Sequence, residues 1–417
     1  MKKYLLFASL LFTGSQFINA QSISETVSVG AGYVNDTWYS LENGVQGSNP
    51  TANWDLTFDL SGFGTSIRAN NGNGVMIYPY PNGDINDWAT VDTSGLSTWT
   101  PNYNDETTWF YGALDKNINS NDPFDVGWGV YDMNTHIISG DSIFIVKLMD
   151  NSYRKLRIDQ MASGAFDFTF AHLDGTNEVQ ASVAKADYAD KLFGYYSLQN
   201  ETAVDHEPVT LENWDLFFGR YTGFIPTPYN LTGIIAGPNT EVVQIDGVAD
   251  VANYNDWGAE TFSNDISTIG ADWKEFMFST MSYEVTDDVV YFVKTQAGDV
   301  WKLIPTGFGG SSDGNFEFTK EKISALSVDE NGMAKAEVMV YPNPATNNVS
   351  FILNNMEANA TTVQILNMEG QIMYEQVLTG KSDFDVKNIP VHAFRSGVYI
   401  VNVNSGEQQF NQKLIIK

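Results

Sequence analysis

The sequence YYSLQN (Tyr195–Asn200), followed by NWDLFF (Asn213–Phe218), decides how this chain is organised, because the same pair of motifs has already occurred once. WYSLEN begins at Trp38, and NWDLTF begins at Asn53. An internal repeat of this length indicates a duplicated structural unit, so it takes precedence over local signals when domains are counted.

The two copies stay in step beyond these motifs. Matching blocks are Asn86-Asp87-Trp88 with Asn255-Asp256-Trp257, DSIFIVK from Asp141 with DVVYFVK from Asp288, and GAFDFTF from Gly164 with GNFEFTK from Gly314. The spacing is constant within each block and changes between blocks, which indicates similar strands joined by loops of unequal length. We therefore predict an ancient duplication of one domain, with copy 1 over residues 21–180 and copy 2 over residues 181–324.

The residue pattern is typical of β-strands. Apolar and polar side chains alternate in WDLTFDL from Trp54 to Leu60, as they do along a half-buried strand. Asn-Gly and Asp-Gly pairs, which accept the positive φ of hairpin turns, recur along the chain. No long stretch has helical periodicity; Ala181 to Leu192 is either a short helix or a linker strand. The predicted fold class is all-β, with two tandem antiparallel β-domains and a further C-terminal β-sandwich.

The N-terminus has the features of a secretory signal peptide over residues 1–20. Lys2 and Lys3 precede an apolar run, Tyr4 to Phe12, that is too short to span a bilayer. Small Ala20 is the predicted residue before cleavage, and Gln21 is then the first mature residue. No other segment approaches the length of a transmembrane helix.

Charge and cysteine content exclude several classes of function. Asp and Glu outnumber Lys and Arg by 51 to 22, for a net charge of −29. This field repels nucleic acid and anionic lipid, so neither is an expected partner. The chain has no cysteine, which excludes disulfides, thiolate metal sites and a lipidated N-terminal cysteine.

The last part of the chain differs in style. Residues 325–337 are small and polar and predict a linker. Residues 338–417 have short strands with turn signals about every ten residues, which predicts a small immunoglobulin-like β-sandwich. The motifs are Tyr341-Pro342-Asn343-Pro344, the hairpin LNMEG, Ser396-Gly397-Val398-Tyr399 and a final strand ending in Lys417.

With its motifs in this order, the segment over residues 338–417 resembles the type A sorting domain of the type IX secretion system. The resemblance implies that the secretion machinery and its sortase handle the protein. The sorting domain is then usually cleaved off. The protein is therefore expected in the medium or attached to the cell surface.

The repeated part resembles the HmuY-like family of secreted all-β haem-binding proteins. The resemblance rests on YYSL…NWDL, the acid-led strand ending in Lys and the closing Phe-x-Phe strand, all of which are framework strands. It implies haem as the cofactor and haem or haemoproteins as partners. The best-known members are lipoproteins, and this chain lacks the cysteine that a lipoprotein requires.

A bis-axial haem site needs two ligands on opposite faces of a flat apolar slot. The resemblance implies a histidine pair from strands or their ends, and His136 with His172 is the candidate pair. Copy 2 has Tyr283 and Lys322 at the corresponding positions, while His206 is predicted in a loop. Methionine thioethers are alternative ligands, although core filling is their commoner role; those considered are Met133, Met149, Met161 and Met281.

Other chemistry has weaker signals. The recurring pairs Trp54/Trp214 and Trp88/Trp257 are interpreted as core anchors, and the non-recurring Trp99 and Trp128 as surface binders. The oxygen-rich stretches 84–87 and 121–125 lack EF-hand spacing, so a metal site stays unassigned. No hydrolase, metalloprotease or phosphate-loop motif occurs.

The sequence thus predicts a secreted, non-catalytic binding protein that captures haem or another hydrophobic ligand, with no catalytic residues. The alternatives are a surface structural or adhesion protein without a haem site, and a glycan-binding or glycan-cleaving protein.

Overall fold

The computed structural model describes residues 22–324, apart from 189, 225 and 259. It also describes residues 337–417, apart from 342, 347, 357–359, 368, 369, 380, 381, 393 and 407. The predicted cleavage site at Ala20 and Gln21 and the predicted linker residues 325–336 lie outside the described residues. The chain divides into two compact units, the first over residues 1–119 and 124–327 and the second over residues 120–123 and 328–417.

The predicted all-β class is confirmed. Within the described residues, helical structure is confined to short 3-10 turns. These are η1 (Thr51–Asn53), η2 (Asn71–Asn73), η3 (Ile85–Thr90), η4 (Leu96–Thr98), η5 (Asp115–Asn117), η6 (Lys185–Tyr188), η7 (Leu211–Asn213) and η8 (Gly310–Ser312). No helix in the described part of the chain is long and apolar enough to cross a membrane.

The first unit consists of two lobes, each with its own hydrophobic core. Lobe 1 is built on residues 51–204, and its core holds Phe58, Phe166, Phe168, Trp128 and Tyr196. Its strands are β4 (Leu56–Asp59), β5 (Ile67–Ala69), β6 (Met76–Pro79), β7 (Gly129–Asp132), β8 (Ile137–Gly140), β9 (Ile143–Lys147), β10 (Tyr153–Ala162), β11 (Ala165–Ala171), β12 (Val179–Ala184), β13 (Phe193–Ser197) and β14 (Thr202–Val204). They form one sheet in the order β14-β13-β4-β5 and another in the order β12-β11-β10-β8-β7, in which β9 joins β10 to β6.

Lobe 2 combines the start and the end of the unit, residues 22–50 and 211–324. Its core holds Tyr39, Phe218, Tyr291, Phe316 and Phe318. Its strands are β1 (Ile23–Ser28), β2 (Asn35–Ser40), β3 (Gly44–Pro50), β15 (Leu216–Phe224), β16 (Pro228–Ala236), β17 (Glu241–Ile245), β18 (Lys274–Met277), β19 (Ser282–Val285), β20 (Val290–Lys294), β21 (Val300–Phe308) and β22 (Asn315–Ser324). The sheets have the orders β16-β15-β2-β3 and β1-β22-β21-β20-β17, and β18 pairs with β19.

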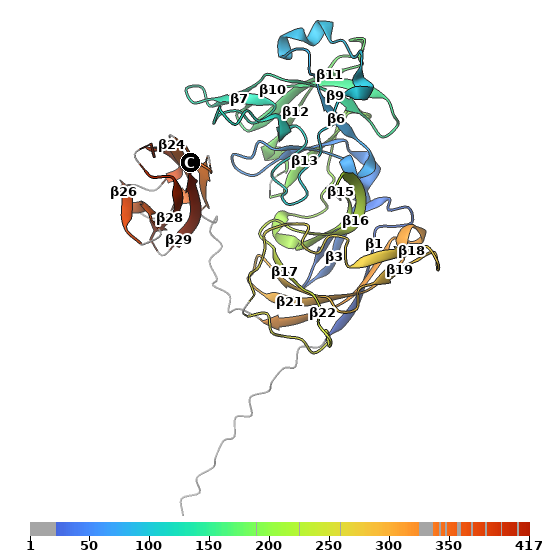
Figure 1. Cartoon of the computed structure of the whole chain (residues 1–417). Helices are drawn as coiled ribbons and strands as arrows, with labels where there is room; N and C mark the ends of the chain where they lie inside the picture. Colours follow the sequence, from blue (N-terminus) through green and yellow to red (C-terminus); the bar gives the residue numbers. More distant parts are fainter. Residues whose placement is uncertain are drawn as a thin grey trace, which may run out of the picture. The chain divides into compact units, whose positions relative to one another are not determined.

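The lobes do not coincide with the two copies of the repeat, because the copies exchange their first three strands. Strands β1, β2 and β3 of copy 1 complete lobe 2, and β12, β13 and β14 complete lobe 1. Figure 1 shows the blue strands β1 and β3 in the lobe formed by the yellow and orange strands. The predicted boundary between residues 180 and 181 falls inside β12. The sequence repeat and the lobes therefore divide the chain at different places.

The register is the same in both lobes. In lobe 2, Tyr39 pairs with Leu216, and in lobe 1, Tyr196 pairs with Leu56. Each pair joins a Tyr-Ser-Leu strand of one copy to the Trp-Asp-Leu strand of the other.

The repeated aspartate stabilises this exchange. The Asp215 carboxylate accepts the backbone N–H of Leu41 at 2.7 Å. The Asp55 carboxylate accepts the N–H of Gln199 at 3.1 Å and the Ser197 hydroxyl at 3.2 Å. Hydrogen bonds offset part of the cost of burying a carboxylate, so each aspartate ties one copy to the other.

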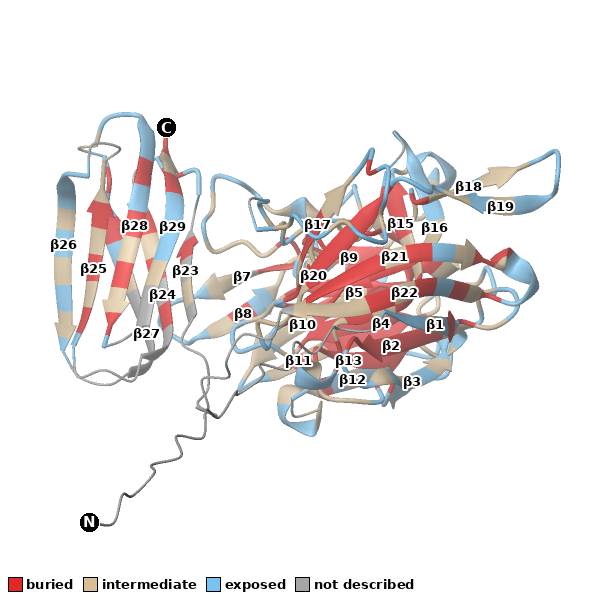
Figure 2. Ribbon diagram, turned by 90° about the horizontal axis from the view of Figure 1, so that it is seen from below, coloured by how far each residue is buried: buried red, intermediate tan, exposed pale blue. Residues whose placement is uncertain are grey.

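The second unit contains a two-sheet sandwich with a core of its own, around Val349, Phe351, Val363, Val401 and Leu414. Its strands are β23 (Glu337–Tyr341), β24 (Asn348–Met356), β25 (Ala360–Leu366), β26 (Ile372–Thr379), β27 (Ser382–Pro390), β28 (Gly397–Ser405) and β29 (Gln408–Ile416). The sheets have the orders β23-β24-β27 and β26-β25-β28-β29. Along β28, buried residues alternate with exposed or intermediate ones, as Figure 2 shows.

The predicted sorting motifs lie at the ends of this sandwich. Tyr341 ends β23, Gly397 begins β28, and Lys417 follows β29; Pro342 is outside the described residues. The Asn343 side chain donates to the Lys413 carbonyl and accepts the Ile415 N–H at 2.8 Å, and Pro344 next to it is exposed. The opening motif is thereby tied to the last strand.

Candidate functional site

A pocket lies between the two lobes of the first unit, and we call it the inter-lobe pocket. Clefts between lobes are common ligand sites because side chains from both sides converge there. The lining combines indole rings, amides and charged groups. Its residues are Asp36, Trp38, Trp54, Thr57, Arg68, Ala69, Asn70, Asn71, Gly72, Asn104, Asp105, Glu106, Trp109, Leu192, Phe193, Tyr195, Glu207, Trp214, Phe217, Arg220, Tyr221, Thr222, Ile235 and Ile266.

The free end of β15 forms one wall of this pocket. β15 pairs with β2 only over Leu216–Phe218, so the strand continues beyond its partner toward lobe 1. There the Phe224 N–H donates to the Glu106 carboxylate at 3.0 Å. From the other side, the Trp109 indole N–H donates to the Ala236 carbonyl at 2.8 Å. These bonds between the lobes hold the two walls in place.

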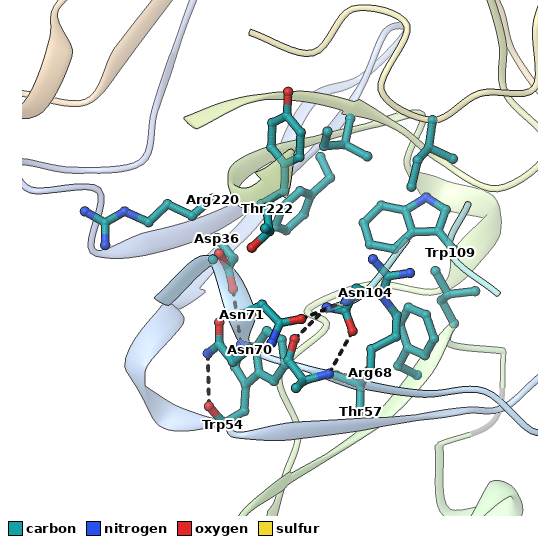
Figure 3. Close-up of a pocket in the computed structure, with 18 of the residues that line it drawn as sticks. Asp36, Trp54, Thr57, Arg68, Asn70, Asn71, Asn104, Trp109, Arg220 and Thr222 are labelled. Atoms are coloured by element: carbon teal, nitrogen blue, oxygen red, sulfur yellow. Dashed lines mark hydrogen bonds between the residues drawn. The ribbon is translucent and has the colours of Figure 1, made fainter. Parts of the chain in front are cut away.

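An amide network forms the floor. The Asn104 side chain donates to the Ala69 carbonyl at 2.6 Å and accepts the Ala69 N–H at 3.0 Å, while its own backbone N–H donates to the Asn71 side chain at 2.8 Å. Figure 3 shows this network beneath the pocket. Asn104 thus orders the floor rather than offering groups to a ligand.

Arg68 supplies a positive charge. Its guanidinium donates to the Thr108 carbonyl at 2.7 Å and the Asp105 carbonyl at 3.4 Å, and it lies 5.3 Å from the centre of the Trp109 ring. Burial lowers its pKa to about 10, while the nearby carboxylates of Asp115 and Asp105 act in the opposite direction. Arg68 therefore stays cationic at neutral pH, and the guanidinium has five N–H donors in total.

At the other end of the pocket, Asp36 is paired with a buried histidine. Its carboxylate lies 2.9 Å from Nε2 of His206 and accepts the Trp54 indole N–H at 3.3 Å. His206 is 1% exposed and is surrounded by the rings of Trp38, Trp54 and Tyr195. The histidine predicted in a loop thus supports a carboxylate that lines the pocket.

Two polar atoms of the lining have no hydrogen-bond partner within the described chain. They are Nε1 of Trp214 and Oγ1 of Thr57, both buried. Buried polar groups are normally paired with protein or water, so these two atoms favour a polar occupant. The cavity volume is about 70 Å³. At 10–15 Å³ for each water, this is room for about five to seven waters. That space suits a small polar group rather than a macrocycle.

The histidines predicted as haem ligands are not brought together. In the register of β10, Met161 lies opposite Ile138 and Lys155 opposite Ala171, so His136 and His172 lie at opposite ends of the strand. At 3.3 Å per residue this is a separation of roughly 30 Å. His136 bonds the Tyr131 hydroxyl at 2.7 Å instead. One iron cannot reach both rings in this conformation, and haem binding stays a prediction that a Soret titration would test.

Other candidate residues have structural positions. Trp128, interpreted above as a surface binder, is completely buried and donates to the Thr65 carbonyl at 2.9 Å, so that interpretation is wrong. Trp99 is half-buried beside Tyr80. Trp54 and Trp214, a recurring pair predicted as core anchors, pack in one hydrophobic cluster and also line the inter-lobe pocket. Of the methionines, Met149 and Met161 pack against the core of lobe 1, whereas Met133 and Met281 are exposed.

The acid-rich turns are stabilised internally. The Asp84 carboxylate accepts the Asn86 N–H at 2.8 Å, and the Asp125 carboxylate accepts the N–H groups of Asn119 and Gly127 at 2.7 and 2.6 Å. Across the described residues, no group of three or more histidine or acidic side chains is placed to hold a metal ion.

Two buried carboxyls, Glu207 in the lining of the inter-lobe pocket and Asp115 within lobe 1, make stability depend on pH. Burial raises the pKa of Glu207 and of Asp115 to about 7, against the lowering effect of the N–H and hydroxyl groups that donate to them. Because these folded-state values exceed the unfolded ones, the folded state binds more protons between about pH 4 and 7, and the free energy of unfolding falls as the pH rises through that window.

We expect the melting temperature to be about 5 °C or more lower at pH 7.5 than at pH 5, as measured by circular dichroism. In Glu207→Gln the dependence should be shallower, whatever its absolute stability. A melting temperature that is constant between these two pH values would contradict the assignment.

Comparison with known proteins identifies the C-terminal domain. Residues 339–417 match the family model described as a secretion system C-terminal sorting domain. The predicted sorting domain is confirmed, and the protein is exported by that route and is secreted or held at the cell surface. The family model matches no part of the repeat, so the HmuY-like resemblance stays a prediction.

Two curated relatives are enzymes. An endo-acting ulvan lyase of Formosa agariphila is 27% identical over 146 residues, which is 34% of this chain and 23% of the relative. Ulvan lyase NLR42 of Nonlabens ulvanivorans is 37% identical over 94 residues, which is 22% of this chain and 16% of the relative. The chain thus spans less than a quarter of either relative, and the shorter alignment is little longer than the sorting domain.

These relatives contradict the prediction of a non-catalytic binding protein that is not an enzyme. Among solved structures, dimeric latent PorU from Porphyromonas gingivalis covers 84% of this chain and 31% of its own at 10% identity, with a TM-score of 0.19. A likeness this low does not indicate a shared fold.

Proposed function

We propose that this protein is an exported polysaccharide-degrading enzyme, a lyase for a uronate-containing glycan, and that the inter-lobe pocket is its saccharide site. The observation that carries the proposal is the convergence, in one pocket, of the Arg68 cation and the Asp36–His206 pair between indole walls. The names of the curated relatives support the reaction class. The proposal corresponds to the glycan-cleaving alternative of the sequence analysis.

Arg68 is assigned to the carboxylate of the substrate. A guanidinium matches a carboxylate with two parallel hydrogen bonds, and such a bond is stronger where water is excluded. The net charge of −29 opposes the approach of an anionic glycan. At about 0.1 M salt the Debye length is about 10 Å, so charges beyond that distance are largely screened and the substrate carboxylate responds mainly to the lining itself. There Arg68 and Arg220 stand beside four acidic residues, Asp36, Asp105, Glu106 and Glu207.

Asp36 is assigned as the proton acceptor. In a lyase reaction, a base removes the proton from the carbon next to the carboxylate, the bond from the neighbouring carbon to the glycosidic oxygen breaks, and a carbon–carbon double bond forms. The proton then passes to the leaving oxygen, so atoms and charge balance. His206, 2.9 Å from Asp36, holds the carboxylate in position, and the unpartnered Trp214 indole N–H is a donor for a sugar hydroxyl.

The test is incubation of the purified protein with ulvan, with other uronate-containing polysaccharides and with neutral ones, at 0.1 M salt or above. We expect cleavage confined to uronate-containing polymers, seen as new reducing ends together with the ultraviolet absorbance of unsaturated uronate. Arg68→Lys, which keeps the charge but loses the planar fork, should raise KM about tenfold or more.

New reducing ends without the ultraviolet signal would indicate hydrolysis and would overturn the lyase assignment. Absence of both signals on every polymer would overturn the enzymatic proposal as a whole.

A further inference from the structure

The inter-lobe pocket is lined by side chains at equivalent positions of the two copies of the repeat. On lobe 1, Tyr195 pairs with Thr57 across β13 and β4, and Thr57 pairs with Arg68 across β4 and β5. Residues paired across neighbouring strands share one face of a sheet, so these three side chains form a row, which we call the lobe 1 row. All three line the pocket.

Lobe 2 presents a second row at the equivalent positions. Trp38 pairs with Phe217 across β2 and β15, and Phe217 pairs with Ile235 across β15 and β16. These three residues also line the pocket, and we call them the lobe 2 row. Because the register is the same in both lobes, each member of one row corresponds to a member of the other. The corresponding members, lobe 1 first, are Tyr195 and Trp38, Thr57 and Phe217, and Arg68 and Ile235.

The two rows differ in chemistry although their positions are equivalent. The lobe 1 row carries two hydroxyls and a guanidinium. The lobe 2 row consists of an indole, a phenyl ring and a branched alkyl chain, and the indole nitrogen is its one polar side-chain atom. The pocket therefore has one polar and one apolar wall, and this difference favours one orientation of a ligand that is polar on one side.

Thr57 is the member of the lobe 1 row whose hydrogen bonding is incomplete. The residue is 2% exposed, and its Oγ1 has no partner in the described part of the chain. By contrast, the Tyr195 hydroxyl donates to Glu207 at 3.1 Å, and the Arg68 guanidinium donates to two backbone carbonyls. An unpaired buried hydroxyl costs free energy, which a valine of similar shape at this position would avoid. The hydroxyl at position 57 thus points to an occupant of the pocket.

On the basis of the proposed function, we propose that Thr57 determines the specificity of the pocket for a carboxylate. The substrate carboxylate lies on the lobe 1 row and accepts hydrogen bonds from the Thr57 hydroxyl and the Arg68 guanidinium. The carbon atoms next to the carboxylate lie on the lobe 2 row.

The geometry suits this arrangement. Side chains opposite each other on paired strands have Cβ atoms about 4.5–5.5 Å apart, so one carboxylate can contact both Thr57 and Arg68. Hydrogen bonds to a charged acceptor are stronger than neutral ones, so a carboxylate gains more from this wall than a hydroxyl does. The cavity of about 70 Å³ has room for a carboxylate and the carbon atoms that carry it.

The experiment measures the binding of one uronate-containing oligosaccharide and of its carboxyl-reduced form, in which a hydroxymethyl group replaces each carboxylate. Thr57→Val should weaken binding of the carboxylated form about tenfold or more, because one hydrogen bond to a charged group is lost. Binding of the reduced form should change by less than about twofold. The melting temperature should equal that of the wild type or exceed it, because no hydrogen bond within the protein is removed.

Thr169→Val is the matched control. Thr169 is a completely buried threonine on β11 of lobe 1, its hydroxyl donates to Asp159 at 2.6 Å, and it lines no part of the pocket. Its replacement should lower the melting temperature by about 2 °C or more, while both oligosaccharides bind as they do to the wild type. The two variants thus separate a hydroxyl that serves the fold from one that serves the ligand.

Each outcome has a separate meaning. Unchanged binding of the carboxylated form by Thr57→Val would show that the hydroxyl meets only water, and equal losses with both forms would show that it does not recognise the carboxylate. Either result overturns the specificity assignment and leaves the enzymatic proposal standing. A wild type that binds the carboxylated form without cleaving the polymer overturns the enzymatic proposal, while the effect of Thr57 is still measured by binding. A wild type that binds neither form overturns both.

Discussion

Residues 51–209 expressed alone are expected to fold cooperatively, whereas residues 21–180, the first copy of the repeat, are expected to stay largely unfolded. The first fragment contains every residue of the core of lobe 1, including the strands β13 and β14 that the second copy contributes. The second fragment lacks both of these strands and ends inside β12.

The free energies of the lost contacts support this difference in folding between the two fragments. Because residues 193–199 are missing, the fragment 21–180 loses the buried side chains of Tyr196 and Leu198, each worth about 1.5–3 kcal/mol. It also leaves the Asp55 carboxylate without its Ser197 and Gln199 partners, at a cost of about 1–3 kcal/mol or more. These losses approach a typical total stability of about 5–15 kcal/mol.

The measurement is far- and near-ultraviolet circular dichroism with thermal melts, with residues 22–324 as the control. Work at low concentration limits association through the exposed interface of the lobes, where Trp54 and Tyr195 lie. A cooperative transition in residues 21–180 and none in residues 51–209 would show that the strand exchange is not the native arrangement.

Asp36→Asn is expected to lower the rate of glycan cleavage by about 10²–10⁴, the usual contribution of a general base. The amide keeps the volume of the carboxylate and can still accept one of its hydrogen bonds, but it cannot take a proton at neutral pH. Polymer binding should therefore change much less than turnover, because the contact with Arg68 is unaffected.

Stability must be measured alongside, because the substitution also removes the partner of buried His206. Asp250→Asn, at an exposed aspartate of lobe 2, is the matched control and should have wild-type activity. Full activity in Asp36→Asn would remove Asp36 from the proposed chemistry. A fall in activity that only tracks a fall in melting temperature would assign it a structural role.

Part of the candidate site could be predicted from the sequence. The repeated Trp54 and Trp214 were predicted as core anchors, and both do pack in one hydrophobic cluster; that they also line a pocket could not be predicted from the repeat. Asp36, Arg68 and His206 had no signal that could be recognised, because they are single residues in unrelated motifs, far apart along the chain. Only the folded chain brings such residues together, since their spacing follows no helical or strand period.

The all-β class, the existence of a repeat and the sorting domain follow from the amino-acid sequence alone, because alternation, turn dipeptides and ordered motifs are local properties of the chain. Which copy completes which lobe is visible only in the folded protein. Trp38-Tyr39-Ser40-Leu41 and Tyr195-Tyr196-Ser197-Leu198 present nearly the same groups to either Trp-Asp-Leu strand, so the hydrogen-bond ladder does not discriminate between them. Because the connection from β11 to β12 is short, pairing these consecutive strands costs little loop-closure entropy. Once β12 occupies that edge of lobe 1, β1 pairs with β22 in lobe 2.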